Sequence, residues 1–384
     1  MRFLLFTILI TLVTLYLLLF SYFWIDIGLI YMLAQTHPFF NNLFAYRLWG
    51  SHNQLVFVVI FLLAIMTLFI LQLGTLFGWL NKIKVKKLLV LFAITSLILA
   101  CSYNFVSHDV FNYLFFAKVT WVSHQNPYQV TPQMHNQDLW VSFMHNIDST
   151  YTYGIFYLIY SIIPIAIFGV SHFILIFYGL RIMNFFLFFL AGLLLLKINK
   201  GDKKVFSYWF LNPYLIVELL MNAHNDLLMI TGFIISMFFI SLQQQIKSIA
   251  SLLVTIFTKS PNFSSPVIFG APALLLNREK WPFYFKVSSL ALFIFLITFS
   301  SHSILNWYYT WIYMLLPFAK LKNYSWILIY LMGLMLILKY QNFLYPWNDF
   351  ISWINIFTKQ VMLILAIGVV LVEIGKPKWF NSNK

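Results

Sequence analysis

The sequence predicts an all-α, polytopic integral membrane protein with about ten to thirteen transmembrane helices and a helical first external loop. Its residues are 62% hydrophobic and 9% charged, whereas soluble domains average roughly 45–50% and about 25%. The run Phe3–Trp24 is apolar apart from Thr and Ser. As a helix it would extend ~33 Å, enough to cross a ~30 Å hydrocarbon core. It has neither the short apolar region nor the cleavage site of a signal peptide, so we expect a retained first helix.

The formal net charge of +14 arises from short basic clusters between apolar runs. This arrangement is typical of cytoplasmic loops under the positive-inside rule. Separated clusters do not form the contiguous basic face that nucleic acid requires, so we expect no nucleic-acid partner. The single Cys101 excludes an intrachain disulfide. The clusters are Lys82, Lys84, Lys86 and Lys87; Lys197, Lys200, Lys203 and Lys204; Arg278 and Lys280; Lys320 and Lys322; and Lys376 and Lys378.

Residues 104–153 form the longest polar stretch, which carries three aspartates and only Lys118 among the Lys and Arg residues. It follows the Lys82 cluster by one apolar run, so we place it outside. We expect one transmembrane unit over residues 1–384. Within it, residues 1–87 would form an N-terminal helix pair, 88–318 a motif-bearing core and 319–384 the C-terminal helices.

Two stretches, 154–196 and 248–276, do not divide cleanly into spans. If both halves of the first crossed fully, the Lys197–Lys204 cluster would lie outside, against the rule. Pro164 permits another hypothesis, in which one half is short or re-entrant. We favour it because it places Asn222–Asp226 on the same side as Asp109. The second stretch contains Pro261 and Pro266, which argue against one straight helix.

Asp109 is the first candidate for chemistry. Ser107 is placed to cap a helix whose first turn holds Asp109, where the helix dipole favours a carboxylate. Asn112 and Tyr113 would share its face, because positions three and four apart are neighbours. An ionised acid there can act as a general base. The alternative is that Asp109 stabilises the helix start and faces water.

Three further segments are candidates. Asn222–Asp226 lies between apolar runs with Glu218 one turn earlier, and it could bind a metal or phosphate, bind an acceptor sugar, or form a polar turn. The metal option lacks a recognised ligand spacing. Lys259 could hold a phosphate or extend to lipid headgroups. The aromatic segment 306–311 could stack on sugars or lie at the membrane interface.

Taken together, these segments resemble the GT-C membrane glycosyltransferases, and most closely their polyprenol-phosphate-mannose-dependent mannosyltransferases. The acid–hydrophobic–aromatic–Tyr pattern of the first external loop, followed by Pro-Tyr, is similar to 109–113 and 127–128 here. Ile155 stands where the family's Tyr-Gly-Pro element has proline. The matching segments are Ser107–Tyr113, Asn126–Tyr128, Tyr153–Ile155, Asn212–Pro213, Asn222–Asp226, Lys259 with Pro261, and Trp307–Tyr308 with Trp311 and Pro317.

The resemblance implies inverting transfer of a hexose, with mannose expected, from a polyprenyl-phosphate donor to an extracytoplasmic glycan or glycolipid at the cell membrane. Asp109 would be the base, and Lys259 or Arg181 would stabilise the leaving phosphate. Some GT-C enzymes use a divalent metal; nothing in the sequence supports one here, and we expect no other cofactor. The other expected substrate-binding residues are His108, Asn112, Tyr113, Tyr128, Asn222, His224, Asp226, Trp307 and Tyr308.

Without the resemblance, the residues indicate only a polytopic membrane protein with an external polar pocket. A transporter or flippase of lipid-linked sugars is the main alternative function. Such proteins often contain inverted repeats and broken helices, and no repeat is evident in the sequence. A non-catalytic membrane subunit that binds a glycan or lipid is a third hypothesis.

Overall fold

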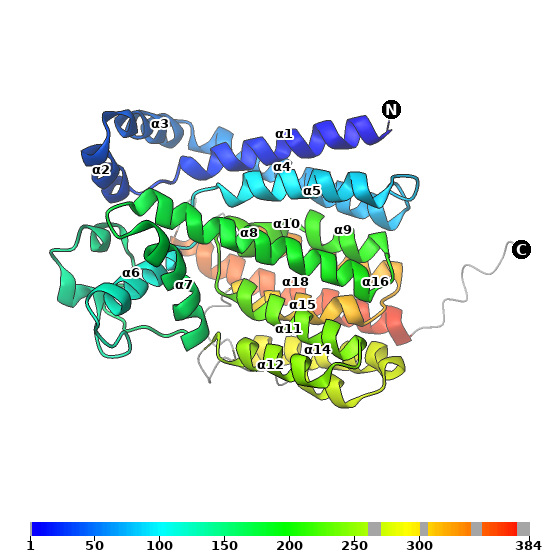
Figure 1. Ribbon diagram of the computed structural model, residues 1–384. Helices are drawn as coiled ribbons and strands as arrows, with labels where there is room; N and C mark the ends of the chain where they lie inside the picture. Colours follow the sequence, from blue (N-terminus) through cyan, green and yellow to red (C-terminus); the bar gives the residue numbers. More distant parts are fainter. Residues whose placement is uncertain (1, 260–269, 300–305, 339–347, 375–384) are drawn as a thin grey trace, which may run out of the picture.

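The computed structural model describes residues 2–259, 270–299, 306–338 and 348–374, and all regular secondary structure within them is helical. Roughly parallel helices form a bundle, and a cap of shorter helices covers one end of it (Figure 1). The main bundle helices are α1 (Arg2–Tyr22), α4 (Gln54–Leu76), α5 (Val85–Ala100), α8 (Phe173–Ile198), α9 (Lys203–Leu211), α11 (Asp226–Ser241), α12 (Gln245–Ile256), α14 (Trp281–Phe299), α16 (Asn323–Leu338) and α18 (Asn348–Ile374). The cap contains α2 (Ile27–Thr36), α3 (Asn41–His52), α6 (Asp109–Val122) and α7 (Ile155–Phe168).

Five helical segments of the described chain are long and apolar enough to cross a membrane, and a sharply bent pair could supply a sixth. This confirms the all-α, polytopic fold class. The expected number of ten to thirteen crossings and the division at residues 87 and 318 stay predictions. The five segments are Phe3–Tyr22, Gln54–Leu76, Phe173–Ile198, Arg278–Thr298 and Ile356–Ile374.

Three of the basic clusters gather at the end of the bundle opposite the cap. Lys203 Nζ donates to the carbonyl oxygens of Asn81 at 2.8 Å and Ile83 at 2.6 Å. Arg278 donates to the carbonyl of Ile198 at 2.6 Å. Three of the basic clusters are therefore neighbours in space. This is the arrangement expected if they share one face of the membrane.

The stretch 154–196 contains one short and one long helix, as we favoured. α7 has 14 residues and reaches ~21 Å, too little to cross ~30 Å of hydrocarbon. It packs on α6 in the cap, and Pro164 lies inside it. α8 has 26 residues and runs the length of the bundle. In the second ambiguous stretch, Pro261 and Pro266 lie outside the described residues.

The bent pair places a polar turn beneath the cap. The π-helical segment η4 (Ile216–Met221), preceded by α10 (Pro213–Leu215), meets α11 at 112°. Ala223 in the turn adopts a left-handed conformation with φ of 52°. Such a turn inside an apolar span is stable only where protein or a polar cavity surrounds it. The turn Asn222–Asn225 is fully buried.

Candidate active site

Asp109 is the first residue of α6, at the base of the cap. The Ser107 hydroxyl accepts the Asp109 backbone N–H at 3.3 Å, while His108 occupies the N-cap position without a side-chain capping bond. The expected polar face does not reach water, because Asn112 and Tyr113 are both buried. Asp109 keeps 16% of its side chain exposed. The hypothesis that it simply faces water does not fit this packing.

His224 lies between two carboxylates. Its Nδ1 is 3.8 Å from Asp109 Oδ2, and its Nε2 is 3.4 Å from Glu218 Oε2. The His224 and Glu218 side chains are 1% and 0% exposed. A line of carboxylate, imidazole and carboxylate therefore runs inward from the most accessible member, Asp109. A proton that Asp109 accepts from another molecule can be shared along these three groups.

Asp226 and Lys259 form a second polar group nearby. Lys259 Nζ lies 3.1 Å from Asp226 Oδ2, and Trp311 Nε1 donates to Asp226 Oδ1. Lys259 is only 5% exposed, which excludes the alternative that it extends to the headgroups. Its ammonium also lies 5.9 Å from the Tyr153 ring centroid. A buried charge pair with further hydrogen bonds is expensive to assemble and points to a specific use.

Gly154 sets the position of Lys259. Its N–H donates to Thr258 O at 3.1 Å, and the Phe156 N–H donates to Phe257 O at 3.2 Å. A Cβ atom on Gly154 would lie 2.0 Å from Phe257 O. The segment Phe257–Lys259 can approach the start of α7 only because residue 154 has no side chain. The close approach of the two segments therefore explains why glycine follows Tyr153 in this motif.

Gly154→Ala is expected to displace the Phe257–Lys259 backbone and to lower the activity that the resemblance implies at least tenfold, because a 1 Å misplacement can cost about 10²-fold. The measurement is initial rate in a reconstituted assay. Gly169→Ala is the control for loss of the glycine at the other end of α7. Nothing lies within 4 Å of the Cβ position there, but the φ of 72° strains an alanine locally, so this variant should cost some stability and keep its activity. Unchanged activity in Gly154→Ala would contradict this role.

Asn222 and Arg181 hold the turn against the segment before α6. The Val106 N–H donates to Asn222 Oδ1 at 3.2 Å, and Asn104 Nδ2 donates to the Asn222 carbonyl. Fully buried Arg181 donates to Asn104 Oδ1 and to the Met221 carbonyl, the latter at 2.7 Å. These contacts keep Asp109 and His224 adjacent. They favour a scaffolding role for both residues over the substrate contacts expected from the sequence.

The predicted aromatic residues surround this polar site. Trp307 stacks on His224 with ring centroids 5.1 Å apart, and Tyr308 packs on Trp311 at 4.7 Å. The Tyr113 hydroxyl accepts the Asn225 N–H at 3.4 Å. A cavity of about 380 Å³ opens beside Lys259; its lining residues are Tyr128, Tyr151, Thr152, Tyr153, Gly154, Ile155, Phe257 and Lys259.

His108 belongs to a different cluster. Its ring stacks on His145 with centroids 3.6 Å apart. Burial, followed by the neighbouring His145, lowers the pKa of His108 to about 3, so its ring is neutral near pH 7. One atom each of Asp26, His108 and His145 lies within 4.8 Å of the others. Within the described residues this is the one group of three such side chains that could hold a metal ion.

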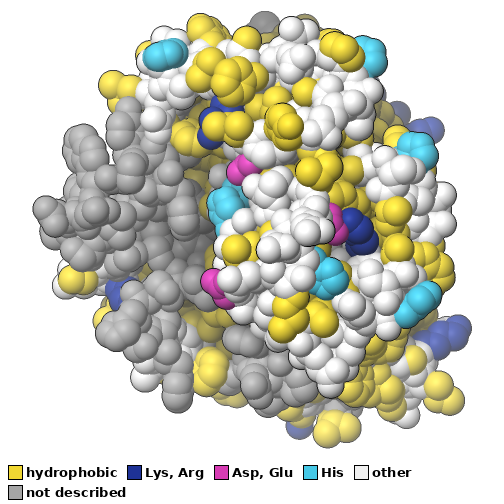
Figure 2. All heavy atoms as spheres, turned by 90° about the vertical axis from the view of Figure 1, so that its left-hand side faces the viewer, with side chains coloured by type: hydrophobic (Ala, Val, Ile, Leu, Met, Phe, Trp, Pro, Cys, Tyr) yellow, Lys and Arg dark blue, Asp and Glu magenta, His cyan; other side chains and the backbone are white. Residues whose placement is uncertain are grey.

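Viewed from the cap end, the molecule exposes several histidines and a few acidic side chains (Figure 2). Sequence reasoning missed the place of Glu218 behind His224, although an acid within an apolar run was a usable signal. It also missed Asp26 and His145, which are far from His108 in the sequence and follow no spacing rule. Only the fold brings these three segments together.

The comparisons with known proteins identify the family. A family profile described as alpha-(1->6)-mannopyranosyltransferase, N-terminal domain, matches residues 27–274. This is more than half of the chain and includes Asp109, His224, Asp226 and Lys259. The chain therefore belongs to this family of mannosyltransferases, as the resemblance to mannosyltransferases predicted. No curated protein and no solved structure gives a match.

Proposed function

We propose that this member of the mannosyltransferase family transfers mannose from a polyprenyl-phosphate donor to a hydroxyl group of an extracytoplasmic glycan or glycolipid, with inversion at the anomeric carbon. The observation that carries the proposal is the line from Asp109 through His224 to Glu218, whose outer carboxylate is the most exposed of the three side chains. A general base must reach the proton that it removes. Asp109 is the member of the line with that access.

In the proposed reaction the acceptor oxygen attacks the anomeric carbon, and the bond from that carbon to the phosphate oxygen breaks. The acceptor proton passes to Asp109, and the electron pair of the broken bond leaves on the polyprenyl phosphate. His224, which lies beside Asp109, and Glu218, on the far side of His224, stabilise the protonated Asp109 carboxyl group. Because Asp109 takes only a proton, no covalent bond forms between sugar and enzyme.

The α-(1→6) linkage in the family description fixes two further features of the proposal. An inverting reaction that forms an α linkage requires a β-linked donor. A 1→6 linkage requires the primary hydroxyl of an acceptor hexose. This hydroxyl is the least hindered on the ring, which suits a base held in a narrow polar site beside aromatic rings.

Lys259 is placed to stabilise the leaving phosphate. It lines the cavity beside Tyr153, whereas Arg181 is buried and donates to the backbone carbonyls of Ala100 and Met221. A separate groove of about 400 Å³ lies between α14, α16 and α18, with apolar lining that extends to Tyr309. Tyr309 directly follows Tyr308 of the site. An apolar groove lined by the residue that follows Tyr308 is a place where a polyprenyl chain could lie, and it supports a lipid-linked donor.

The proposed side of the reaction rests on the basic loops. They gather at the end opposite the cap, and such loops stay in the cytoplasm. The cap and Asp109 would then face the extracytoplasmic side of the cell membrane. Cysteine labelling tests this: a cysteine at exposed Gln137 in the cap would react with an impermeant reagent in intact cells, whereas one at Asn199 would not.

The function is tested by reconstituting the full chain in liposomes with radiolabelled polyprenyl-phosphate mannose and an α-mannoside acceptor. We expect time-dependent formation of an α-(1→6)-linked product at the acceptor. Movement of the labelled lipid between leaflets without any glycan product would instead favour the transporter. Binding without either process would favour a non-catalytic subunit.

His224→Gln is expected to lower kcat by about 10²-fold, because Asp109 loses the ring that orients it and stabilises its protonated form. The pH–rate profile should also change, because the imidazole that lies between the two carboxylates is gone. Glu218→Gln should give the same kind of change, and the double variant should be no worse than His224→Gln alone. Additive losses with an unchanged pH profile would contradict the line of three groups.

A further inference from the structure

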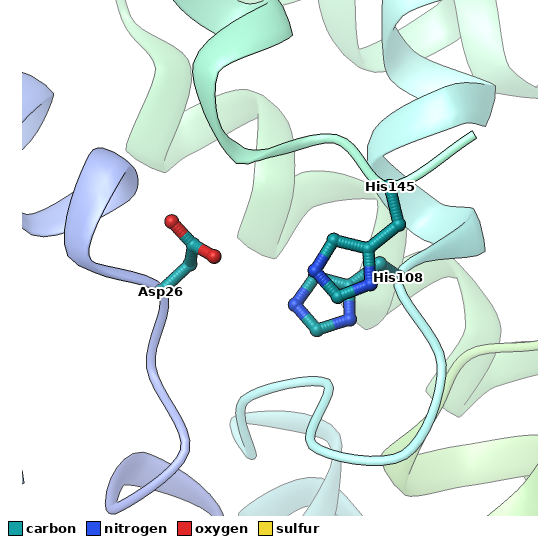
Figure 3. Close-up of side chains that lie close together, drawn as sticks. All are labelled: Asp26, His108 and His145. Atoms are coloured by element: carbon teal, nitrogen blue, oxygen red, sulfur yellow. The ribbon is translucent and has the colours of Figure 1, made fainter. Parts of the chain in front are cut away.

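Three segments that are distant in sequence meet at the edge of the cap. Asp26 precedes α2, His108 precedes α6, and His145 lies in the loop after η3 (Leu139–Phe143). Figure 3 shows the two imidazole rings stacked face to face with the Asp26 carboxylate opposite them. One potential ligand atom of each residue lies within 4.8 Å of the others. None of the three belongs to the line formed by Asp109, His224 and Glu218.

The donor set selects a class of metal ion. Two imidazoles and one carboxylate are ligands that Zn²⁺ and related first-row divalent ions bind well. Ligands of a tetrahedral zinc ion lie about 3.4 Å apart, given bonds of about 2.0–2.1 Å. The spread of up to 4.8 Å exceeds this by about 1.4 Å, and the His145 ring must also turn off the His108 ring, because a metal ion binds in the plane of each imidazole. His145 is exposed and can supply that movement.

The two inner ligands are already oriented by other groups. The Asp26 N–H donates to the Tyr103 hydroxyl at 3.1 Å, and this hydroxyl lies 3.5 Å from His108 Nε2. Asp26 Oδ1 also accepts the Gly28 N–H at 2.7 Å and so caps α2. Tyr103 is itself buried. Such outer partners, which fix the ligands before the ion arrives, are a regular feature of protein metal sites.

We propose that Asp26, His108 and His145 bind one divalent transition-metal ion of the zinc class. The ion fastens α2 and the loop that carries His145 to the start of α6. His108 directly precedes Asp109, so the ion also fixes the position of the Asp109 backbone. Three protein ligands leave one tetrahedral position for water. The site is separate from the proposed sugar transfer, and its occupancy does not depend on that function.

The test is direct metal binding by the full chain, purified in detergent through a tag that contains no histidine and then treated with a chelator. Zn²⁺ is titrated in competition with a chromophoric chelator, and Co²⁺ reports coordination geometry by its visible absorption. We expect about one ion per chain with the intense bands of a tetrahedral site. His145→Ala and Asp26→Asn should each weaken binding by more than the about 10–100-fold that loss of an outer partner costs.

The variants are chosen so that the fold is retained. His145 is exposed, and asparagine at position 26 can still cap α2. His124→Asn, another exposed histidine of the same external segment, is the matched control and should bind Zn²⁺ as the unmodified protein does. Hydrogen exchange over residues 104–112 should slow when Zn²⁺ is bound.

Two results would overturn the proposal. One is the absence of stoichiometric Zn²⁺ binding by the unmodified protein. The other is equal binding by His145→Ala, Asp26→Asn and the unmodified protein. If Zn²⁺ binds through these residues while exchange over residues 104–112 stays unchanged, the role in fixing Asp109 is wrong. None of these measurements requires sugar transfer, so they are independent of the proposed function.

Discussion

Asp109→Asn is expected to lower kcat for mannosyl transfer by about 10²–10⁴-fold, the range that a positioned general base contributes. Asparagine has the same size but cannot take the acceptor proton. KM should change little, because the acceptor and donor contacts remain. The measurement is steady-state transfer from polyprenyl-phosphate mannose in liposomes. The fold should persist, since an acidic residue in the first turn of a helix contributes only about 0.3–1 kcal/mol.

Asp148→Asn is the matched control for this variant. Asp148 lies in the same polar stretch, residues 104–153, but is exposed, outside the polar site. We expect it to keep the activity of the unmodified protein. Activity within tenfold of the unmodified protein in Asp109→Asn would contradict the base role. A loss in both variants would indicate that the overall charge of residues 104–153 matters instead.

The local elements of the site were predictable from sequence. Long apolar runs define spans at ~1.5 Å per residue, and a lone acid in an apolar chain stands out. For this reason the sequence alone predicts both Asp109 and the turn Asn222–Asp226 as parts of a site, but not how close they lie. The structure adds that they meet through one contact, between Asp109 Oδ2 and His224 Nδ1 at 3.8 Å.

The tertiary contacts were not predictable, because they depend on chain paths that no spacing rule encodes. Arg181 was expected near a phosphate, because the resemblance implies a cation beside the leaving group. Instead it donates to carbonyls at the ends of other helices. The partnership of Asp26 with His108 joins residues 82 positions apart in a chain whose N-terminal segment showed no motif.

Lys259→Met is expected to have two effects, because the lysine pairs with a buried carboxylate and, in the proposed reaction, stabilises the leaving group. Loss of the ammonium leaves Asp226 buried with Trp311 Nε1 as its hydrogen-bond donor, and breaking a buried pair costs about 3–5 kcal/mol. Loss of a cation at a leaving oxygen should lower kcat by about 10²–10³-fold. Thermal unfolding and transfer rate measure the two effects.

A double variant separates these effects. In Lys259→Met/Asp226→Asn the unpaired charge is gone, and the amide oxygen introduced at position 226 can still accept the Trp311 N–H, so most of the stability should return. Transfer should stay at the level of Lys259→Met, because the phosphate still lacks its cation. Lys118→Met breaks the more exposed pair with Asp138 and should cost about 1 kcal/mol or less. Recovery of activity together with stability in the double variant would make Lys259 a structural counterion only, and the leaving phosphate would then need another partner.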